Sequence, residues 1–343
     1  MRIVIFGAGG FLGSTICEEL YQRKDVEQLA CIRKWASAVR LARRGIEIRQ
    51  VDLEDISQLA TALTGADAVV NASMPPSPRE PELATSLYHA CDQAKVRRFI
   101  QLSSAVVYGD RTGEVNESMP VSPQDDYSRG KAKMEGLLIE AAARSATQLY
   151  ILRPSIIYGP FSGAWTVRYV ERIIKGRWRT LGRCGNGICN LVHARDVARL
   201  VIAAATVDTA PGLHVLNLNG PDVITWNEYI ERLGGALGIP GRVTPNAVLF
   251  RWVTIAAEIL RLGGTSKWVR TLYQRSNGKA KSVMTSAQDV TLLYPSPSEL
   301  ALLGQRVHYS TERAARILGL SASISVEEGL RQSVAWCRVH GIA

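Results

Sequence analysis

Tyr127 and Lys131 are the residues whose types and spacing could do acid–base chemistry in this chain. Residues four apart share one face of a helix, so the phenol and the ammonium would lie side by side. A phenol titrates near pH ~10 and is a poor base at neutral pH, but a fixed positive charge beside it stabilises the phenolate. The same spacing also arises by chance on solvated helix faces. The interpretation therefore depends on the elements that position the pair.

A glycine-rich turn near the N-terminus predicts a dinucleotide-binding unit. The apolar run at residues 3–6 leads into Gly7, Gly10 and Gly13, and a helical pattern follows through Leu20. In a strand, glycine turn and helix of this kind, the glycines let the backbone approach a pyrophosphate at the helix N-terminus. The alternative, a tight turn before a packing helix, requires no ligand.

The first half of the chain alternates predicted strands with predicted helices. Strands are expected at about residues 28–32, 45–51, 68–73, 98–102 and 149–152, and helices at 55–63, at 83–94 and around Tyr127. This alternation indicates an α/β fold with a parallel, doubly wound sheet that binds ligands at the carboxyl ends of its strands. The glycine turn, residues 71–73 and the pair Ser103-Ser104 all follow such ends. The sequence therefore predicts one crevice that gathers them beside the start of the Tyr127 helix.

Two cations follow the second predicted strand. NAD-selective proteins usually place an acid at this point, on the adenosine ribose. Arg33 and Lys34 stand here instead, and they suit a 2′-phosphate. NADP(H) is therefore the preferred cofactor, with NAD(H) as the alternative.

Composition narrows the class of protein. The 343 residues are 46% hydrophobic and 21% charged, which is typical of a soluble globular protein of one large or two smaller domains. The net charge of +10 is spread along the chain, so a small anionic ligand is expected and a nucleic-acid partner is not. No segment is long and apolar enough to span a bilayer, and no secretory signal is visible.

The six cysteines lack a CxxC pair, which indicates reduced thiols and a cytoplasmic location. Cys184, Cys189 and His193 could be drawn as three metal ligands. Their spacing fits no common zinc pattern, so no metal is expected.

Together these features resemble the extended short-chain dehydrogenase/reductase family, the branch with nucleotide-sugar epimerases, dehydratases and 3β-hydroxysteroid dehydrogenase-like enzymes. The resemblance covers nearly the whole chain. It rests on six landmarks in order: Gly7 to Gly13, Asp52-Leu53, Ser103 to Gly109, Tyr127 to Lys131, Leu152 to Pro160, and Leu191 to Ala198.

The resemblance implies a Rossmann domain over residues 1–160, with later returns near 188–218, and a smaller C-terminal substrate-binding lobe over most of 161–343. It implies that Tyr127 is the general acid/base, that Lys131 stabilises its phenolate and holds the nicotinamide ribose, and that Ser104 bonds the same substrate oxygen. In the alternative reading, the two serines only close the strand end. The implied cofactor contacts are Gly7, Gly10, Phe11, Leu12, Gly13, Arg33, Lys34, Asp52, Leu53, Asn71, Ala72, Ser73, Tyr127, Lys131, Pro154 and Ile156, and the implied substrate contacts are Ser104, Tyr158, Trp165 and Arg168.

Departures from the family pattern restrict the chemistry. Dehydratases that resemble this chain carry an Asp-Glu pair directly after the serine, and decarboxylating relatives carry a glutamate there. Ala105 and Val106 occupy these positions, which argues against both reactions. Many nucleotide-sugar members also place an arginine just before the motif at His193, and this chain does not. Arginines that could substitute for it are Arg168, Arg172, Arg177, Arg179 and Arg183.

The sequence thus predicts an NAD(P)-dependent enzyme that transfers hydride at a secondary alcohol or ketone of a small molecule, most simply a sugar-type epimerase or ketoreductase. The alternatives are a 3β-hydroxysteroid dehydrogenase-like enzyme acting on an apolar alcohol and a non-catalytic NADP(H)-binding regulator. A homodimer is expected.

Five segments of the second half carry structural predictions. Thr225 and Glu228 form a capping box that opens a helix at 225–237. Residues 192–193 and 215–218 are expected to return to the sheet or its edge. The apolar stretch 249–262 predicts a buried helix, or one that rests on a membrane or lines an apolar channel. The polar stretch 276–297 predicts a mobile segment or lid.

Overall fold

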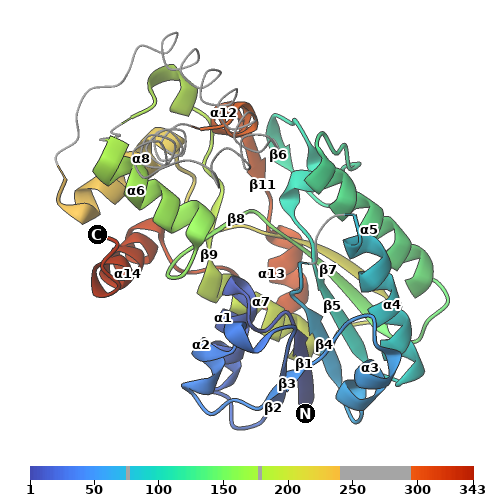
Figure 1. The fold of residues 1–343 in the computed structure, drawn as a ribbon. Helices are drawn as coiled ribbons and strands as arrows, with labels where there is room; N and C mark the ends of the chain where they lie inside the picture. Colours follow the sequence, from blue (N-terminus) through green and yellow to red (C-terminus); the bar gives the residue numbers. More distant parts are fainter. Residues whose placement is uncertain (75–77, 177–179, 240–294) are drawn as a thin grey trace, which may run out of the picture. The chain divides into compact units, whose positions relative to one another are not determined.

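The computed structural model describes residues 1–74, 78–176, 180–239 and 295–343. The chain forms two compact units (Figure 1). The first contains residues 1–158, 190–221 and 308–325, and the second contains 159–189, 222–307 and 326–343. The predicted helix at 249–262, nearly all of the predicted mobile segment at 276–297, and Arg177 and Arg179 lie outside the described residues.

A seven-stranded parallel sheet forms the centre of the first unit, among the residues that the structure describes. Its order is β3-β2-β1-β4-β5-β7-β10, so the direction of strand addition reverses between β1 and β4. Doubly wound sheets bind their ligands at such a switch point. The predicted fold class is therefore confirmed. The strands are β1 (Arg2–Phe6), β2 (Glu27–Ile32), β3 (Ile48–Gln50), β4 (Ala68–Asn71), β5 (Arg98–Leu102), β7 (Gln148–Pro154) and β10 (Leu213–Leu218).

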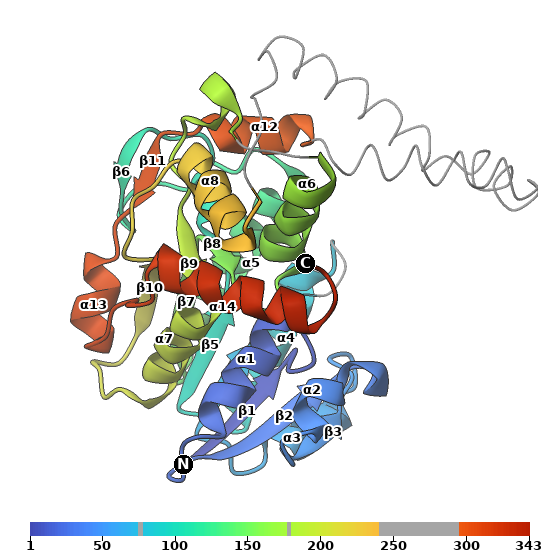
Figure 2. The same cartoon turned by 90° about the vertical axis from the view of Figure 1, so that its left-hand side faces the viewer.

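Helices cover both faces of this sheet. One face carries α1 (Phe11–Leu20), α2 (Val39–Ala42), α7 (Ala194–Thr206) and α13 (Glu312–Leu318). Figure 2 shows α1 and α7 side by side here. The other face carries α3 (Ile56–Leu63), α4 (Glu80–Gln93) and α5 (Asp126–Ala142).

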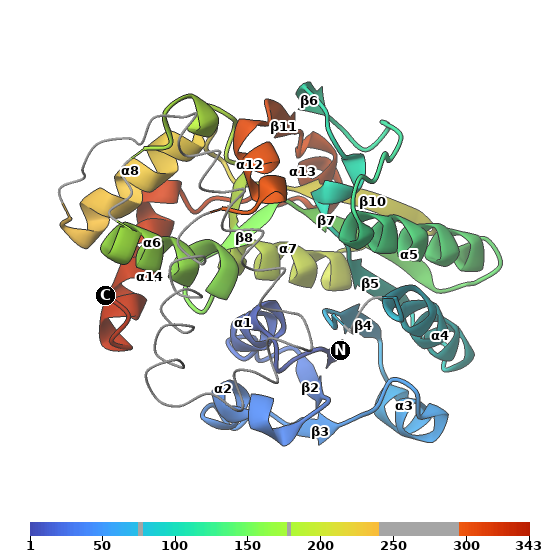
Figure 3. The same cartoon turned by 45° about the horizontal axis from the view of Figure 1, so that its top comes forward.

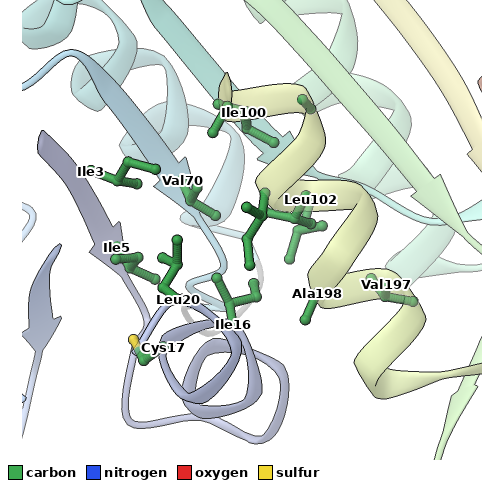
Figure 4. Packing of buried hydrophobic residues seen from close by; sticks show 14 of the residues in the cluster. Ile3, Ile5, Ile16, Cys17, Leu20, Val70, Ile100, Leu102, Val197 and Ala198 are labelled. Carbon is green, nitrogen blue, oxygen red and sulfur yellow. The ribbon is translucent and has the colours of Figure 1, made fainter. Parts of the chain in front are cut away.

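The alternation of side chains along the strands explains the two layers. Ile3 and Ile5 of β1 pack with Ile16 of α1 in one buried cluster (Figure 4). Val4 and Phe6 belong to the opposite cluster, with residues of α3, α4 and α5. Burying each such side chain contributes roughly 1.5–3 kcal/mol, so both faces of the strands stabilise the sheet.

The prediction that residues 192–193 return to the main sheet or its edge is wrong. β9 (Leu191–His193) pairs in parallel with β8 (Ile156–Tyr158) in a separate two-stranded sheet. β7 ends at Pro154, which has no N–H to continue a ladder, and the chain leaves the main sheet there to form β8. Residues 215–218 do join the sheet, in β10. A second small sheet pairs β6 (Gly113–Val115) with β11 (Val307–Tyr309).

The second unit is mainly helical in its described residues. Its α-helices are α6 (Arg168–Gly176), α8 (Trp226–Leu237), α12 (Pro297–Gly304) and α14 (Val326–Val339). The predicted capping box is confirmed, because the Thr225 hydroxyl accepts from the Glu228 amide and the Glu228 carboxylate accepts from the Thr225 amide. Trp165, Tyr169 and Trp226 pack as an aromatic cluster.

Among the described residues, no helix has the combination of length and apolar character that crossing a bilayer requires.

Candidate active site

The glycine turn lies against the end of β4. Gly7 has φ of +76°, and a Cβ there would lie 2.5 Å from the backbone of Ala72 and from the amide nitrogen of Ser73. A Cβ at Gly13, in the first turn of α1, would overlap the Gly7 carbonyl. Only glycine therefore lets β1, β4 and α1 approach this closely.

The N-terminus of α1 is open to an anion. Gly10 caps the helix without a side-chain hydrogen bond, and the first turn contains no acidic residue. The amides of this turn thus keep their hydrogen-bonding capacity, and the helix dipole favours negative charge there. Phe11 and Leu12 are partly buried in the same turn. These residues fit the pyrophosphate of a dinucleotide.

The other predicted cofactor residues at the carboxyl ends of β2, β3 and β4 divide into exposed and structural groups. Arg33 and Lys34 are exposed directly after β2, and Asp52 is exposed shortly after β3. Leu53 is partly buried against the adjacent core. Asn71 is buried, donates to the Gln101 side chain at 2.8 Å and accepts from the Ser73 hydroxyl at 2.5 Å. Asn71 and Ser73 therefore fix the turn after β4.

The start of α5 brings Tyr127 and Lys131 together. Asp125 and Ser128 form a capping box that begins the helix immediately before Tyr127. Tyr127 is 46% exposed, whereas Lys131 is 4% exposed. The Lys131 Nζ lies 5.8 Å from the centroid of the Tyr127 ring, within the range of a cation–π contact. The predicted shared helix face is confirmed.

Ser104 follows β5 and caps a short 3₁₀ helix at Ala105–Tyr108. Its Oγ accepts from the Val106 amide at 3.3 Å. This bond uses the oxygen as an acceptor and leaves the hydroxyl hydrogen able to donate. Ser103 is buried and donates to Glu135 at 2.5 Å, so its role is structural.

Lys131 contacts a buried carboxylate, Glu80, which was not predicted from the sequence. The Lys131 Nζ donates to Glu80 Oε1 at 2.6 Å and to the Leu102 carbonyl at 3.3 Å. Glu80 is the first residue of α4, which begins three residues earlier than predicted. The available signal was Pro81 with an acid on either side, which is typical of a first helical turn.

A second buried network, also missed, holds α5 against β7. The Arg153 guanidinium donates to Glu135 at 2.5–3.2 Å and to the Tyr108 hydroxyl at 2.7 Å, and Tyr108 donates to Asn217 at 2.8 Å. Burial raises the pKa of Tyr108, although Arg153 opposes this effect. Burial disfavours the charged form of Arg153, but its bonds to Glu135 outweigh this and raise its pKa. The network fixes the helix that carries Tyr127.

The remaining predicted residues lie in two places. Pro154 ends β7 and Ile156 begins β8, both within the first unit. Tyr158 is buried there, and its hydroxyl donates to the Ser325 carbonyl at 3.3 Å, which does not suit the predicted contact with substrate. Trp165 and Arg168 belong to the second unit, where Trp165 stacks on Tyr169 and Arg168 is exposed at the start of α6. Their contact with substrate stays a prediction.

No group of three or more His, Cys, Asp or Glu side chains that could hold a metal ion occurs within residues 1–74, 78–176, 180–239 and 295–343. Burial raises the pKa of the Cys189 thiol well above its usual value, which disfavours the thiolate that a metal would need.

Several known proteins resemble this chain in sequence or in fold. The 2-alkyl-3-oxoalkanoate reductase of Shewanella oneidensis is 23% identical over 96% of this chain and 84% of that protein. The N-acetyl-alpha-D-glucosaminyl-diphospho-ditrans,octacis-undecaprenol 4-epimerase of Escherichia coli O157:H7 is 24% identical over 69% of this chain and 72% of that protein. The crystal structure of UDP-glucuronic acid 4-epimerase from Bacillus cereus in complex with NAD shares the fold, with a TM-score of 0.73, 17% identity and 99% of both chains covered. Residues 3–218 match the NAD dependent epimerase/dehydratase family, and the chain belongs to that family.

Proposed function

We propose that the protein binds a nicotinamide dinucleotide in its first unit and transfers hydride at a secondary alcohol or ketone. The observation that carries the proposal is the exposed Tyr127 phenol held beside the buried Lys131 ammonium, on a helix that starts at the ligand-binding edge of the sheet. The turn from Gly7 to Gly13 and the open N-terminus of α1 support the dinucleotide part of the proposal.

The side chains of this site divide the proton chemistry among them. When bound, the dinucleotide supplies the hydride exchange. Tyr127 donates its phenolic proton to a carbonyl oxygen, or accepts one from an alcohol in the opposite direction. Lys131 places a positive charge beneath the ring and stabilises the phenolate. Ser104 donates its hydroxyl hydrogen to the same substrate oxygen and stabilises the charge that develops there.

The substrate class has two candidates. The Bacillus cereus epimerase is named for a UDP-sugar, and the first candidate is a sugar-type epimerase reaction in which the dinucleotide is regenerated in each cycle. The Shewanella oneidensis reductase matches more of the chain than the undecaprenol epimerase does, and this favours reduction of a 3-oxo acid as the second candidate. If the protein is an epimerase, NMR should show that it inverts C4 of UDP-glucose or UDP-glucuronic acid without net loss of dinucleotide. A reductase would consume one reduced dinucleotide for each 2-alkyl-3-oxoalkanoate.

The decisive variant is Tyr127→Phe, which removes the proton donor and keeps the ring. The expected loss of kcat is roughly 10²–10⁴-fold, with the dinucleotide Kd changed by less than about twofold. Tyr21→Phe is the matched control, because Tyr21 is similarly exposed, at 51%, and lies just after α1. Full activity in Tyr127→Phe would refute the proposed role.

The cofactor proposal extends to NADP(H). Arg33 and Lys34 are exposed after β2 and support a preference for the 2′-phosphate, although the Bacillus cereus structure contains NAD. Calorimetric titration should give a lower Kd for NADPH than for NADH, and the reverse order would overturn this preference.

Two further proposals concern assembly and location. The family resemblance supports a homodimer, which light scattering of the purified protein would test. The six free cysteines support a cytoplasmic location, which fractionation of cells that express the protein would test.

A further inference from the structure

Lys131 takes part in a buried ion pair whose other member comes from a different helix. Glu80 and Lys131 are 7% and 4% exposed, and Oε1 and Nζ are 2.6 Å apart. A lone buried ammonium is costly because it loses its hydration, and the ion pair with the Glu80 carboxylate offsets part of that cost.

The fold holds Glu80 firmly in this position. It is the first residue of α4, where the helix dipole favours a carboxylate, and Pro81 fixes the backbone of the first turn. The helices α4 and α5 lie side by side (Figure 3). Leu87 of α4 and Met134 and Leu138 of α5 belong to one buried cluster. Because both helices pack into this common core, the backbones that carry Glu80 and Lys131 are held at a fixed separation.

The contacts of Lys131 determine where its ammonium points. An ammonium has three N–H donors. Two of them engage Glu80 and the Leu102 carbonyl, which ends β5 next to Ser103 and Ser104. One donor remains for Tyr127 or for the ribose that the family resemblance assigns to Lys131.

We propose that Glu80 is a positioning residue of the Tyr127–Lys131 centre and that its charge biases the site toward the oxidised dinucleotide. The inference rests on the proposed function, because it places the nicotinamide beside Lys131. The oxidised nicotinamide ring carries a positive charge and the reduced ring carries none. The Lys131 charge alone disfavours the oxidised ring, and the Glu80 carboxylate 2.6 Å away offsets that charge. Glu80 therefore favours the oxidised form relative to a site that has Lys131 without it.

The chain contains a matched control for this pair. Lys133 and Glu82 join the same two helices, also at 2.6 Å, but they are 58% and 56% exposed. An exposed pair contributes little and is screened by water and salt. Glu80→Gln and Glu82→Gln thus remove the same charge from the same helix turn, once at the centre and once at the surface.

The experiment measures the Kd of the oxidised and of the reduced dinucleotide by isothermal titration calorimetry, with NAD⁺ and NADH and in parallel with NADP⁺ and NADPH. In Glu80→Gln, the ratio of the Kd of the oxidised dinucleotide to the Kd of the reduced dinucleotide should rise roughly fivefold to tenfold, which is the effect of one charge in a partly buried site. Glu82→Gln should leave the ratio unchanged. Glu80→Asp keeps the charge and should retain most of the wild-type ratio even if it lowers the thermal stability.

Each outcome supports or overturns the inference. A ratio in Glu80→Gln equal to that of Glu82→Gln, with both variants folded by circular dichroism, overturns it and leaves the proposed function intact. The Asp variant is a second test, because a ratio that shifts despite the retained charge contradicts the electrostatic role. If the wild-type protein binds none of the four dinucleotides, the proposed function and the inference fall together.

Discussion

Replacing Glu135 by Gln should destabilise the protein far more than one lost surface charge would. Glu135 is 3% exposed and accepts four hydrogen bonds, three from Arg153 and one from Ser103. The amide of a glutamine would turn N–H donors toward the Arg153 guanidinium, so at least two charge-assisted bonds are lost. At about 1.5–3 kcal/mol each, these two bonds predict a loss of about 3–6 kcal/mol, which overlaps the roughly 3–5 kcal/mol typical of removing one partner of a buried ion pair.

Equilibrium urea unfolding followed by far-ultraviolet circular dichroism measures this loss. Glu82→Gln serves as the control, because its exposed pair with Lys133 is worth about 0–1 kcal/mol. The double variant Glu135→Leu/Arg153→Met leaves no buried charge without a partner and should recover at least about half of the lost free energy of unfolding.

Two results would refute this reasoning. A loss in Glu135→Gln no larger than that in Glu82→Gln would show that the buried network does not hold α5 in place. A double variant that is less stable than Glu135→Gln would show that the Arg153 side chain stabilises the fold by itself.

Two further predictions concern the glycine turn and the thiols. Gly7→Ala should lower the free energy of unfolding by at least about 1–2 kcal/mol and weaken dinucleotide binding at least about tenfold in calorimetry, because Gly7 has φ of +76° and no room for a Cβ. Gly136→Ala is the control: Gly136 lies on α5, and a Cβ there would have nothing within 4 Å, so this variant should raise the free energy of unfolding by up to about 1 kcal/mol. Burial raises the pKa of Cys17 and of Cys31 to about 12, and Cys184 alone among the six cysteines is partly exposed. A thiol reagent at pH 8 should therefore label at most one cysteine in the native protein and six after denaturation. Rapid labelling of two or more cysteines in the native protein would contradict the buried environment.

Local patterns in the sequence predicted the framework of the first unit well. The strands around Ile5, Val70 and Ile100 were found because each is a short apolar run bounded by polar or glycine residues. The third strand was predicted at 45–51 but spans only Ile48–Gln50. Apolar character alone did not locate the ends of this strand, because the backbone hydrogen bonds with β2 define them.

Contacts between distant segments could not be read in the same way. The proline-rich stretch before Leu83 has the composition of a loop, so the start of α4 was predicted too late. Proline is in fact well tolerated in a first helical turn. Glu80 and Lys131 are 51 residues apart, and Glu135 and Arg153 are 18 apart. No periodicity links such positions, so the pairs that hold the candidate site together emerge only when the helices and strands are packed.

The last segment of the first unit has a consequence for how the protein is made. Residues 308–325 complete this unit: Tyr309 stacks on Tyr108, Ser310 donates to the Val115 carbonyl, and Ala314 and Leu318 enter the same buried cluster as β1. During synthesis on the ribosome, the sheet and the Tyr127 helix emerge long before this segment does. The first unit therefore stays incomplete, with the face of Tyr108 that Tyr309 covers still exposed, until residues 308–325 have been translated.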